Sequence, residues 1–213
     1  MAEFFDYLFS QYEGYTPLFL TLELTAVFFG LLSVIFSARN SILVYPTGLV
    51  STFIFVYIMF TADLYGDLII NAYYFYMSVY GWILWSRKGR NNEDVLKITS
   101  VTAKDNLKSA LIFVVSVIFV STVFIWFNKF TYWWAFVDTF ITGLFFIGMW
   151  LLAKRKLENW LYLIAGDVIA VPLYFYKGLI FTGFFTIILT IIAIIGYLSW
   201  RRTLRNEKQR QLI

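Results

Sequence analysis

The chain has 213 residues, of which 61% are hydrophobic and 22% aromatic, whereas soluble domains are only about 45–50% apolar. Cysteine and histidine are both absent, which excludes disulfides, thiol chemistry and the usual histidine-based acid–base or metal chemistry. The net charge of +4 does not indicate a nucleic-acid site, because the positions of the basic residues follow the orientation of membrane-spanning helices.

The chain begins with a segment, 1–16, that carries three acids and no Lys or Arg. A cleaved secretory signal has a basic start, so we expect an extracytoplasmic N-terminal segment instead. About 17–25 mostly apolar residues cross a bilayer as a helix. By this measure the sequence predicts an all-α integral membrane protein with seven transmembrane helices, near 17–36, 41–60, 67–85, 109–127, 133–153, 158–176 and 178–200.

The basic residues predict the orientation of these helices. Seven spans put the termini on opposite sides, and 15 of the 17 Lys and Arg residues then fall on one side. They lie mainly in the polar segment 86–108 and in the tail 201–213, while Lys129 and Lys177 are on the other side. The positive-inside rule therefore predicts an N-terminus outside and a cytoplasmic C-terminus.

The first three spans resemble the last three, which predicts an internal repeat. GLLSVIF at 30–36 aligns with GMWLLAK at 148–154 at an offset of 118, and GWILWSRK at 81–88 aligns with GYLSWRR at 196–202 at an offset of 115. We therefore expect two parallel three-helix bundles, 17–85 and 133–200, joined by a linker helix within 109–132. Such a 3+1+3 plan is typical of transporters.

Three acids fall inside the predicted spans: Glu23, Asp138 and Asp167. A charge at the helix centre costs about 2.5–3.5 kcal/mol on insertion scales, so such a residue normally faces a cavity or a partner. No Lys or Arg lies at mid-span. The acids are thus expected to be protonated, hydrated or available to a cation.

Polar and aromatic residues share helical faces with these acids. Flat rings stack on solutes and attract cations through their quadrupole, and a carboxylate adds charge complementarity. The pattern predicts a site for a planar cationic heteroaromatic solute. Alternatives stay open, since the rings also suit the membrane interface, the polar groups also suit helix–helix bonds and Asp138 also suits solvent. The candidate residues are Asn71, Tyr74 and Ser78 on the third span, Asp138, Thr142 and Phe145 on the fifth, and Trp160, Asp167 and Tyr174 on the sixth.

Three motifs resemble the Pnu family of bacterial vitamin transporters: NAYYFYMSVYGWILW at 71–85, KLENW at 156–160 and D....PLYFYKG at 167–178. The resemblance covers about residues 17–202. It implies a fold similar to full-length SWEET transporters, a place in the bacterial inner membrane, a homotrimer and no enzymatic activity. It also implies uptake of nicotinamide riboside by facilitated diffusion, followed by trapping through a cytoplasmic vitamin kinase.

Three positions depart from the riboside-type pattern. Asn71 and Met149 stand where this type carries glutamine, and Leu163 stands where it commonly carries tryptophan. The resemblance places Met149 at the substrate site, and the departures keep thiamine as the alternative solute.

Two other functions are weighed against transport of a vitamin. Asp138 and Asp167 could form the shared-proton pair of an intramembrane aspartyl protease, although the IAGD sequence lacks the second glycine of the GxGD pattern. Glu23 and the aspartates could instead line an ion or proton channel.

Overall fold

A computed structural model describes residues 16–62, 65–89, 95–127 and 132–210. The predicted N-terminal segment, apart from Thr16, and Lys129 lie outside the described residues. The described chain is all-helical, as predicted, and Thr99 and Lys156 form an isolated bridge. Its helices are α2 (Pro17–Ala38), α3 (Val44–Thr61), α4 (Tyr65–Trp85), α5 (Ala103–Trp126), α6 (Trp134–Ala153), α7 (Asn159–Tyr176) and α8 (Ile180–Arg210).

Five of these helices, α2, α3, α5, α6 and α8, are long and apolar enough to cross a membrane. The remaining two, α4 and α7, are less apolar along their spans, which include Asn71 on α4 and Asp167 on α7. Both helices lie against neighbours from the apolar set. The two most polar of the predicted spans are therefore the ones from which we expect functional side chains.

Two helix ends differ from the sequence prediction. The helix α5 begins at Ala103, within the predicted polar segment, because Thr102 and Asp105 form a capping box. Thr102 Oγ1 accepts from the Asp105 backbone N–H at 3.2 Å, and Asp105 Oδ2 accepts from the Thr102 N–H at 2.9 Å, which satisfies two backbone donors at the helix start. The helix α8 continues to Arg210, so most of the predicted tail is helical.

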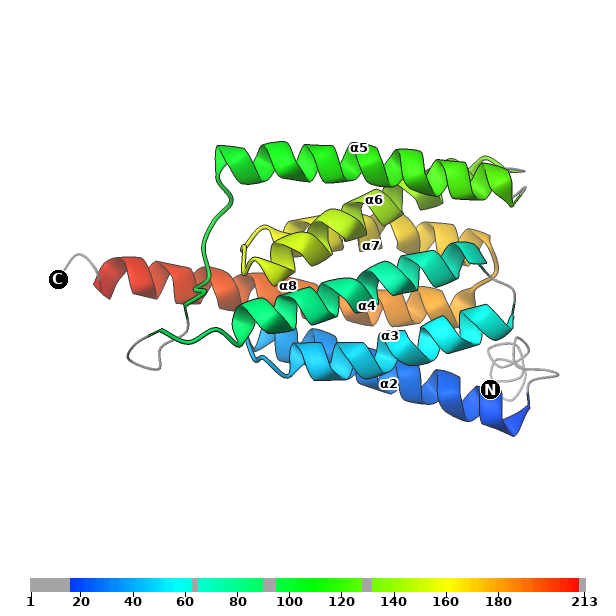
Figure 1. Ribbon diagram of the computed structural model, residues 1–213, viewed down its shortest axis with the longest axis horizontal. Helices are drawn as coiled ribbons and strands as arrows, with labels where there is room; N and C mark the ends of the chain where they lie inside the picture. The colour runs from blue at the N-terminus through cyan, green and yellow to red at the C-terminus, as the bar shows by residue number, and fades with distance from the viewer. Residues whose placement is uncertain (1–15, 63–64, 90–94, 128–131, 211–213) are drawn as a thin grey trace.

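The helices lie side by side along one common direction, and α8 projects beyond the others toward the C-terminus (Figure 1). We call this end of the molecule the tail end. In the first half, α3 packs against both α2 and α4, and in the second half, α7 packs against both α6 and α8. The halves meet through α2 with α8 and through α4 with α6, while α5 packs mainly on α6.

Corresponding features of the two halves lie 115 residues apart. The helices α3 and α7 have 18 residues each, and both their first and last residues differ by 115 in number. Each preceding turn contains one residue with a φ of 53°, Asn40 in the first half and Arg155 in the second. The offset of 118 predicted for the first two spans is therefore wrong by three residues. Glycines in similar apolar runs produced the false match.

Four aromatic residues close the bundle at the tail end. Tyr45 meets Trp85 edge-on with ring centroids 5.1 Å apart, and Trp160 meets Trp200 in the same way at 5.7 Å. These pairs are again 115 residues apart, and Trp85 also contacts Trp200 across the two halves at 6.1 Å. All four rings are buried. Edge-to-face packing of this kind stabilises aromatic clusters beyond the area that they bury.

Candidate functional site

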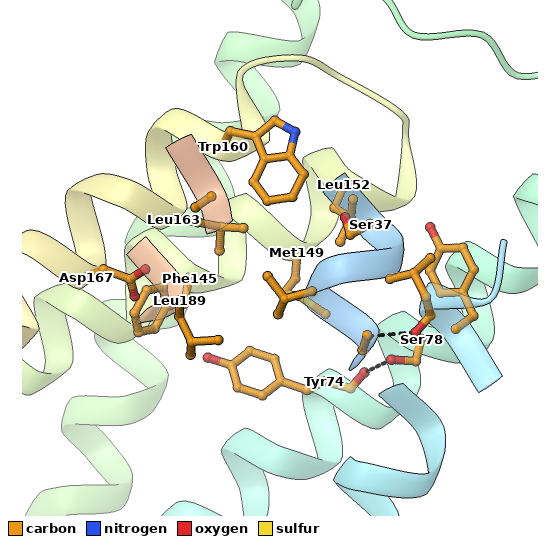
Figure 2. A pocket seen from close by; sticks show the side chains of 15 residues that line it. Ser37, Tyr74, Ser78, Phe145, Met149, Leu152, Trp160, Leu163, Asp167 and Leu189 are labelled. Carbon is orange, nitrogen blue, oxygen red and sulfur yellow. Dashed lines mark hydrogen bonds between the residues drawn. The ribbon is translucent and has the colours of Figure 1, made fainter. Parts of the chain in front are cut away.

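A cavity of about 250 Å³ lies between the two halves, next to the aromatic cluster at the tail end. Six of the seven described helices contribute to its wall, all except α5. Figure 2 shows how side chains from these helices converge on one space. The lining residues are Ser33, Val34, Ser37, Val44, Tyr45, Tyr74, Ser78, Phe145, Met149, Leu152, Trp160, Leu163, Asp167, Leu189 and Ala193.

Asp167 is the acidic residue of this wall. It lies near the middle of α7 and is only 7% exposed. The side chain of Thr190 on α8 is its polar neighbour. Among the residues that the structure describes, no Lys or Arg forms a salt bridge with Asp167. A buried carboxylate without a basic partner is costly unless a ligand cation or a proton neutralises it.

Aromatic residues line the same space from four helices. Tyr45 comes from α3, Tyr74 from α4, Phe145 from α6 and Trp160 from α7. The Tyr74 hydroxyl points toward the side of the cavity on which Asp167 and Leu189 lie (Figure 2). Phe145 is held close to α7 because it packs against Gly166, where a Cβ would lie 2.5 Å from the ring. The wall thus combines flat surfaces with one acid, an arrangement that favours a planar cation.

Three polar atoms of the cavity-lining residues have no protein hydrogen-bond partner in the described part of the chain. They are Ser37 Oγ, Tyr45 Oη and Trp160 Nε1, and each atom is buried. Most buried polar groups in proteins are hydrogen-bonded, so exceptions call for an explanation. The two hydroxyls beside the cavity offer donors and acceptors to the hydroxyl or amide groups of a ligand, whereas the Trp160 nitrogen lies on the side of its ring away from the other labelled lining residues (Figure 2).

Six of the ten predicted substrate-binding residues line this cavity: Tyr74, Ser78, Phe145, Met149, Trp160 and Asp167. The structure does not bring the other four to it. Asn71 lies two turns before Ser78 on α4, and Tyr174 packs with a small apolar cluster around Ala170. Thr142 Oγ1 donates to the Asp138 backbone oxygen at 2.8 Å, within α6.

Asp138 is the fourth residue outside the cavity, and it forms a salt bridge with Lys177, just after α7. The expectation that every intramembrane acid lacks a basic partner is therefore wrong for Asp138. Lys177 lies just after the predicted span, but α7 ends close enough to Asp138 on α6 for the two side chains to pair. The ion pair gives Asp138 a structural partner at the end of the bundle opposite to the tail end.

The geometry also separates the two aspartates. Phe145 on α6 packs against Gly166 on α7, so these positions lie at the same level. Asp138 is seven residues before Phe145, which is roughly 10 Å along the helix at 1.5 Å per residue. Carboxyl groups that share a proton lie about 3 Å apart, and this arrangement gives the protease hypothesis no support.

Sequence reasoning missed Ser33, Ser37 and Tyr45 as cavity residues. These side chains lie on α2 and α3, which carry none of the predicted substrate-binding residues. The internal repeat contained the signal for Tyr45, because at the offset of 115 this residue corresponds to Trp160. The false offset of 118 concealed that correspondence.

Comparisons with known proteins agree with the motifs found in the sequence. The profile of the nicotinamide mononucleotide transporter family matches residues 20–202. The chain is similar to proteins named nicotinamide riboside transporter PnuC from Escherichia coli (strain K12) and Shigella flexneri. Each is 27% identical over 217 residues, and the match covers 90% of this chain and 89% of the relative.

A solved structure has the same fold. The crystal structure of the vitamin B3 transporter PnuC superposes with a TM-score of 0.66 at 20% identity, covering 87% of this chain and 82% of that chain. The resemblance to the Pnu family is confirmed by the profile and the curated relatives. The chain is a multi-pass membrane protein and belongs to the nicotinamide mononucleotide transporter family.

Proposed function

We propose that this protein carries nicotinamide riboside across the membrane by facilitated diffusion. The observation that carries the proposal is the Asp167 carboxylate, buried in an aromatic cavity between the two halves of a transporter-family chain. The solute is a flat cationic heteroaromatic ring joined to a sugar with hydroxyl groups. The cavity volume, about 250 Å³, lies just below the range of about 300–1,000 Å³ for small-molecule sites, so a solute of nucleoside size would nearly fill it.

Each part of the wall has a proposed role. Asp167 faces the cationic ring, while Tyr74 and Phe145 pack against its faces. The buried hydroxyls of Ser37 and Tyr45 bind the polar groups of the solute. This extends the binding set predicted from sequence, in which Asn71 and Ser78 bind the hydroxyl or amide groups of the solute. After release, a cytoplasmic vitamin kinase traps the solute by phosphorylation.

The proposed architecture is the 3+1+3 plan, with α2–α4 and α6–α8 as parallel bundles and α5 as the linker. Support comes from the matching contacts within each half and from the 115-residue correspondence of α3 with α7. Resemblance to the family supports a homotrimer in the bacterial inner membrane. Native mass spectrometry of the detergent-solubilised chain tests the trimer, and a monomer as the largest species would contradict it.

Thiamine is the second candidate solute, and one observation favours it. Met149 and Leu163, two of the three positions that depart from the riboside-type pattern, both line the cavity. They present apolar surface where an amide and an indole are expected, which reduces recognition of a carboxamide and leaves the cation and ring contacts intact.

Calorimetric titration of the solubilised chain with each vitamin distinguishes the two solutes. We expect tighter binding of nicotinamide riboside than of thiamine. Tighter binding of thiamine would make thiamine the proposed solute. If neither vitamin binds, the proposal of vitamin transport is contradicted.

Uptake of radiolabelled vitamin into proteoliposomes without an ion gradient tests the mechanism. A facilitator equilibrates the solute, with saturable flux that unlabelled vitamin inhibits. An ion channel instead gives a steady conductance across a planar bilayer. If the vitamin binds but does not equilibrate across the membrane, the proposed solute stands and facilitated diffusion is contradicted.

A further inference from the structure

A second cavity, of about 600 Å³, lies at the tail end beside the projecting part of α8. It shares no lining residue with the cavity around Asp167. Ser100 and Leu157 form one side, and the rest of the wall comes from α8, namely Leu198, Arg201, Arg202, Leu204, Arg205 and Lys208. We propose that this basic pocket binds the phosphate headgroup of an anionic phospholipid.

The basic pocket has four cationic side chains and no carboxylate in its wall. Within the part of the chain that the structure describes, none of the four forms a salt bridge. The nearby Lys156 is different, because its Nζ lies 3.0 Å from Asp105 Oδ2. The acid Glu158 is also engaged, since it accepts a hydrogen bond from the Val101 backbone N–H at 2.9 Å. The charge of the pocket is therefore available to an external anion.

One face of α8 favours a lipid over a soluble anion. Ile191, Ile194 and Leu198 follow one another at three- and four-residue spacing, and all three are exposed. The same spacing continues through the basic residues Arg201, Arg205 and Lys208, so one helical stripe changes from apolar to cationic within a single turn. A phospholipid has this profile, with acyl chains beside a phosphate. Inorganic phosphate has no use for the apolar part.

The position of the basic pocket fits the same ligand. Basic pockets between transmembrane helices on the cytoplasmic side are sites at which anionic headgroups bind. Leu157 and Leu204 add apolar surface to the wall, and the stems of Arg and Lys side chains pack well on such a surface. The pocket thus offers apolar contact to the glycerol region and cations to the phosphate.

Thermal unfolding of the full chain in detergent tests the proposal. We expect phosphatidylglycerol to raise Tm by about 2–4 °C relative to phosphatidylcholine with the same acyl chains. Inorganic phosphate should produce no such shift. An equal shift with phosphatidylcholine would show that charge plays no part, and an equal shift with phosphate would identify a soluble anion as the ligand. Either result overturns the proposal.

Two matched variants locate the effect. Arg201→Gln, Arg205→Gln and Lys208→Gln together should abolish the shift. The control combines Arg87→Gln, Lys104→Gln and Lys108→Gln, which removes the same charge from exposed positions outside the pocket, and it should retain the shift. Equal loss in both variants would reduce the effect to net charge and refute a defined site.

A measurement on the unaltered chain covers the case in which the pocket variant does not fold. Native mass spectrometry after incubation with equal amounts of the two lipids should show preferential retention of phosphatidylglycerol. Equal retention of both lipids would refute the proposal without any substitution.

Discussion

At the residue scale, the role of Asp167 depends on its surroundings more than on its burial. The second intramembrane aspartate, Asp138, has Lys177 as a partner, whereas Asp167 forms no salt bridge within the described residues. A cationic ligand would therefore do for Asp167 what Lys177 does for Asp138. This contrast supplies a matched pair of substitutions.

Asp167→Asn should weaken vitamin binding at least about tenfold, near 1.4 kcal/mol, because the amide preserves shape and removes charge. Calorimetric titration measures the change. Asp138→Asn is the control, since it removes a carboxylate outside the cavity, and its affinity should remain close to that of the parent. Equal losses in the two variants would contradict a direct contact between Asp167 and the solute.

Tyr45→Phe tests the buried hydroxyl that lacks a protein partner. Leaving such a group buried costs about 1–3 kcal/mol, so its removal should leave the Tm of the empty protein unchanged or raise it. Vitamin binding should weaken, because the same hydroxyl is proposed to contact the solute. Thermal unfolding and titration of one preparation give both values.

The control for this substitution is Tyr73→Phe. The Tyr73 hydroxyl donates to the Phe146 backbone oxygen at 3.0 Å and does not line the cavity. This variant should lose stability, by about 0.5–1.5 kcal/mol, and keep its affinity. A Tyr45→Phe variant that behaves in the same way would remove Tyr45 from the proposed binding set.

At the element scale, close packing between helices at the tail end depends on two glycines at equivalent positions. A Cβ on Gly81 would overlap the Tyr45 ring, and a Cβ on Gly196 would lie 2.6 Å from the Trp160 ring. Because the rings are buried against other aromatics, they have little room to move. Each glycine therefore allows α4 or α8 to approach the preceding helix of its half.

Gly81→Ala should consequently destabilise the protein by about 1–3 kcal/mol, the usual cost of overpacking a core. Gly30→Ala is the control, because its Cβ would meet only the small Ser51 side chain, with the hydroxyl oxygen at 3.0 Å. Thermal unfolding should show a clearly larger fall in Tm for Gly81→Ala. A fall of the same size in both variants would mean that helix propensity, and not ring contact, sets the result.

The helices themselves were the most predictable feature, because long apolar runs between polar segments define membrane spans. The residues of these helices that reach the cavity were less predictable. Asn71 and Thr142 share helical faces with cavity residues, yet only the ends of those faces nearest the tail end reach the cavity. Depth along a helix depends on how its neighbours cross it, and sequence periodicity contains no such information.

At the scale of the whole molecule, family and helical class could be read from the sequence, while long-range partners could not. Lys177 follows its span and therefore seemed to be a loop residue, but it pairs with Asp138 across 39 positions. Tyr45 and Ser37 join the site from the first half of the chain only when the two halves meet. These contacts arise from tertiary packing, for which a single sequence taken alone gives no direct signal.

Orientation in the membrane can be tested directly, because the chain has no cysteine of its own. Ala62→Cys lies at the exposed end of α3, and Ser86→Cys lies just after α4. The positive-inside rule predicts that a membrane-impermeant maleimide labels Ala62→Cys in intact cells and labels Ser86→Cys only after permeabilisation. Labelling in the opposite order would reverse the orientation proposed for every segment.

Two indole hydrogen bonds at the tail end fasten the halves to each other. Trp85 Nε1 on α4 donates to the Ala153 oxygen of α6 at 3.2 Å, and Trp200 Nε1 on α8 donates to the Ser37 oxygen of α2 at 3.0 Å. Any motion that separates the two halves at the tail end must break both hydrogen bonds and also the contact between Trp85 and Trp200. A solute pathway at the tail end would therefore open cooperatively, in a single step. Replacing either tryptophan alone would weaken the whole contact between the halves at this end.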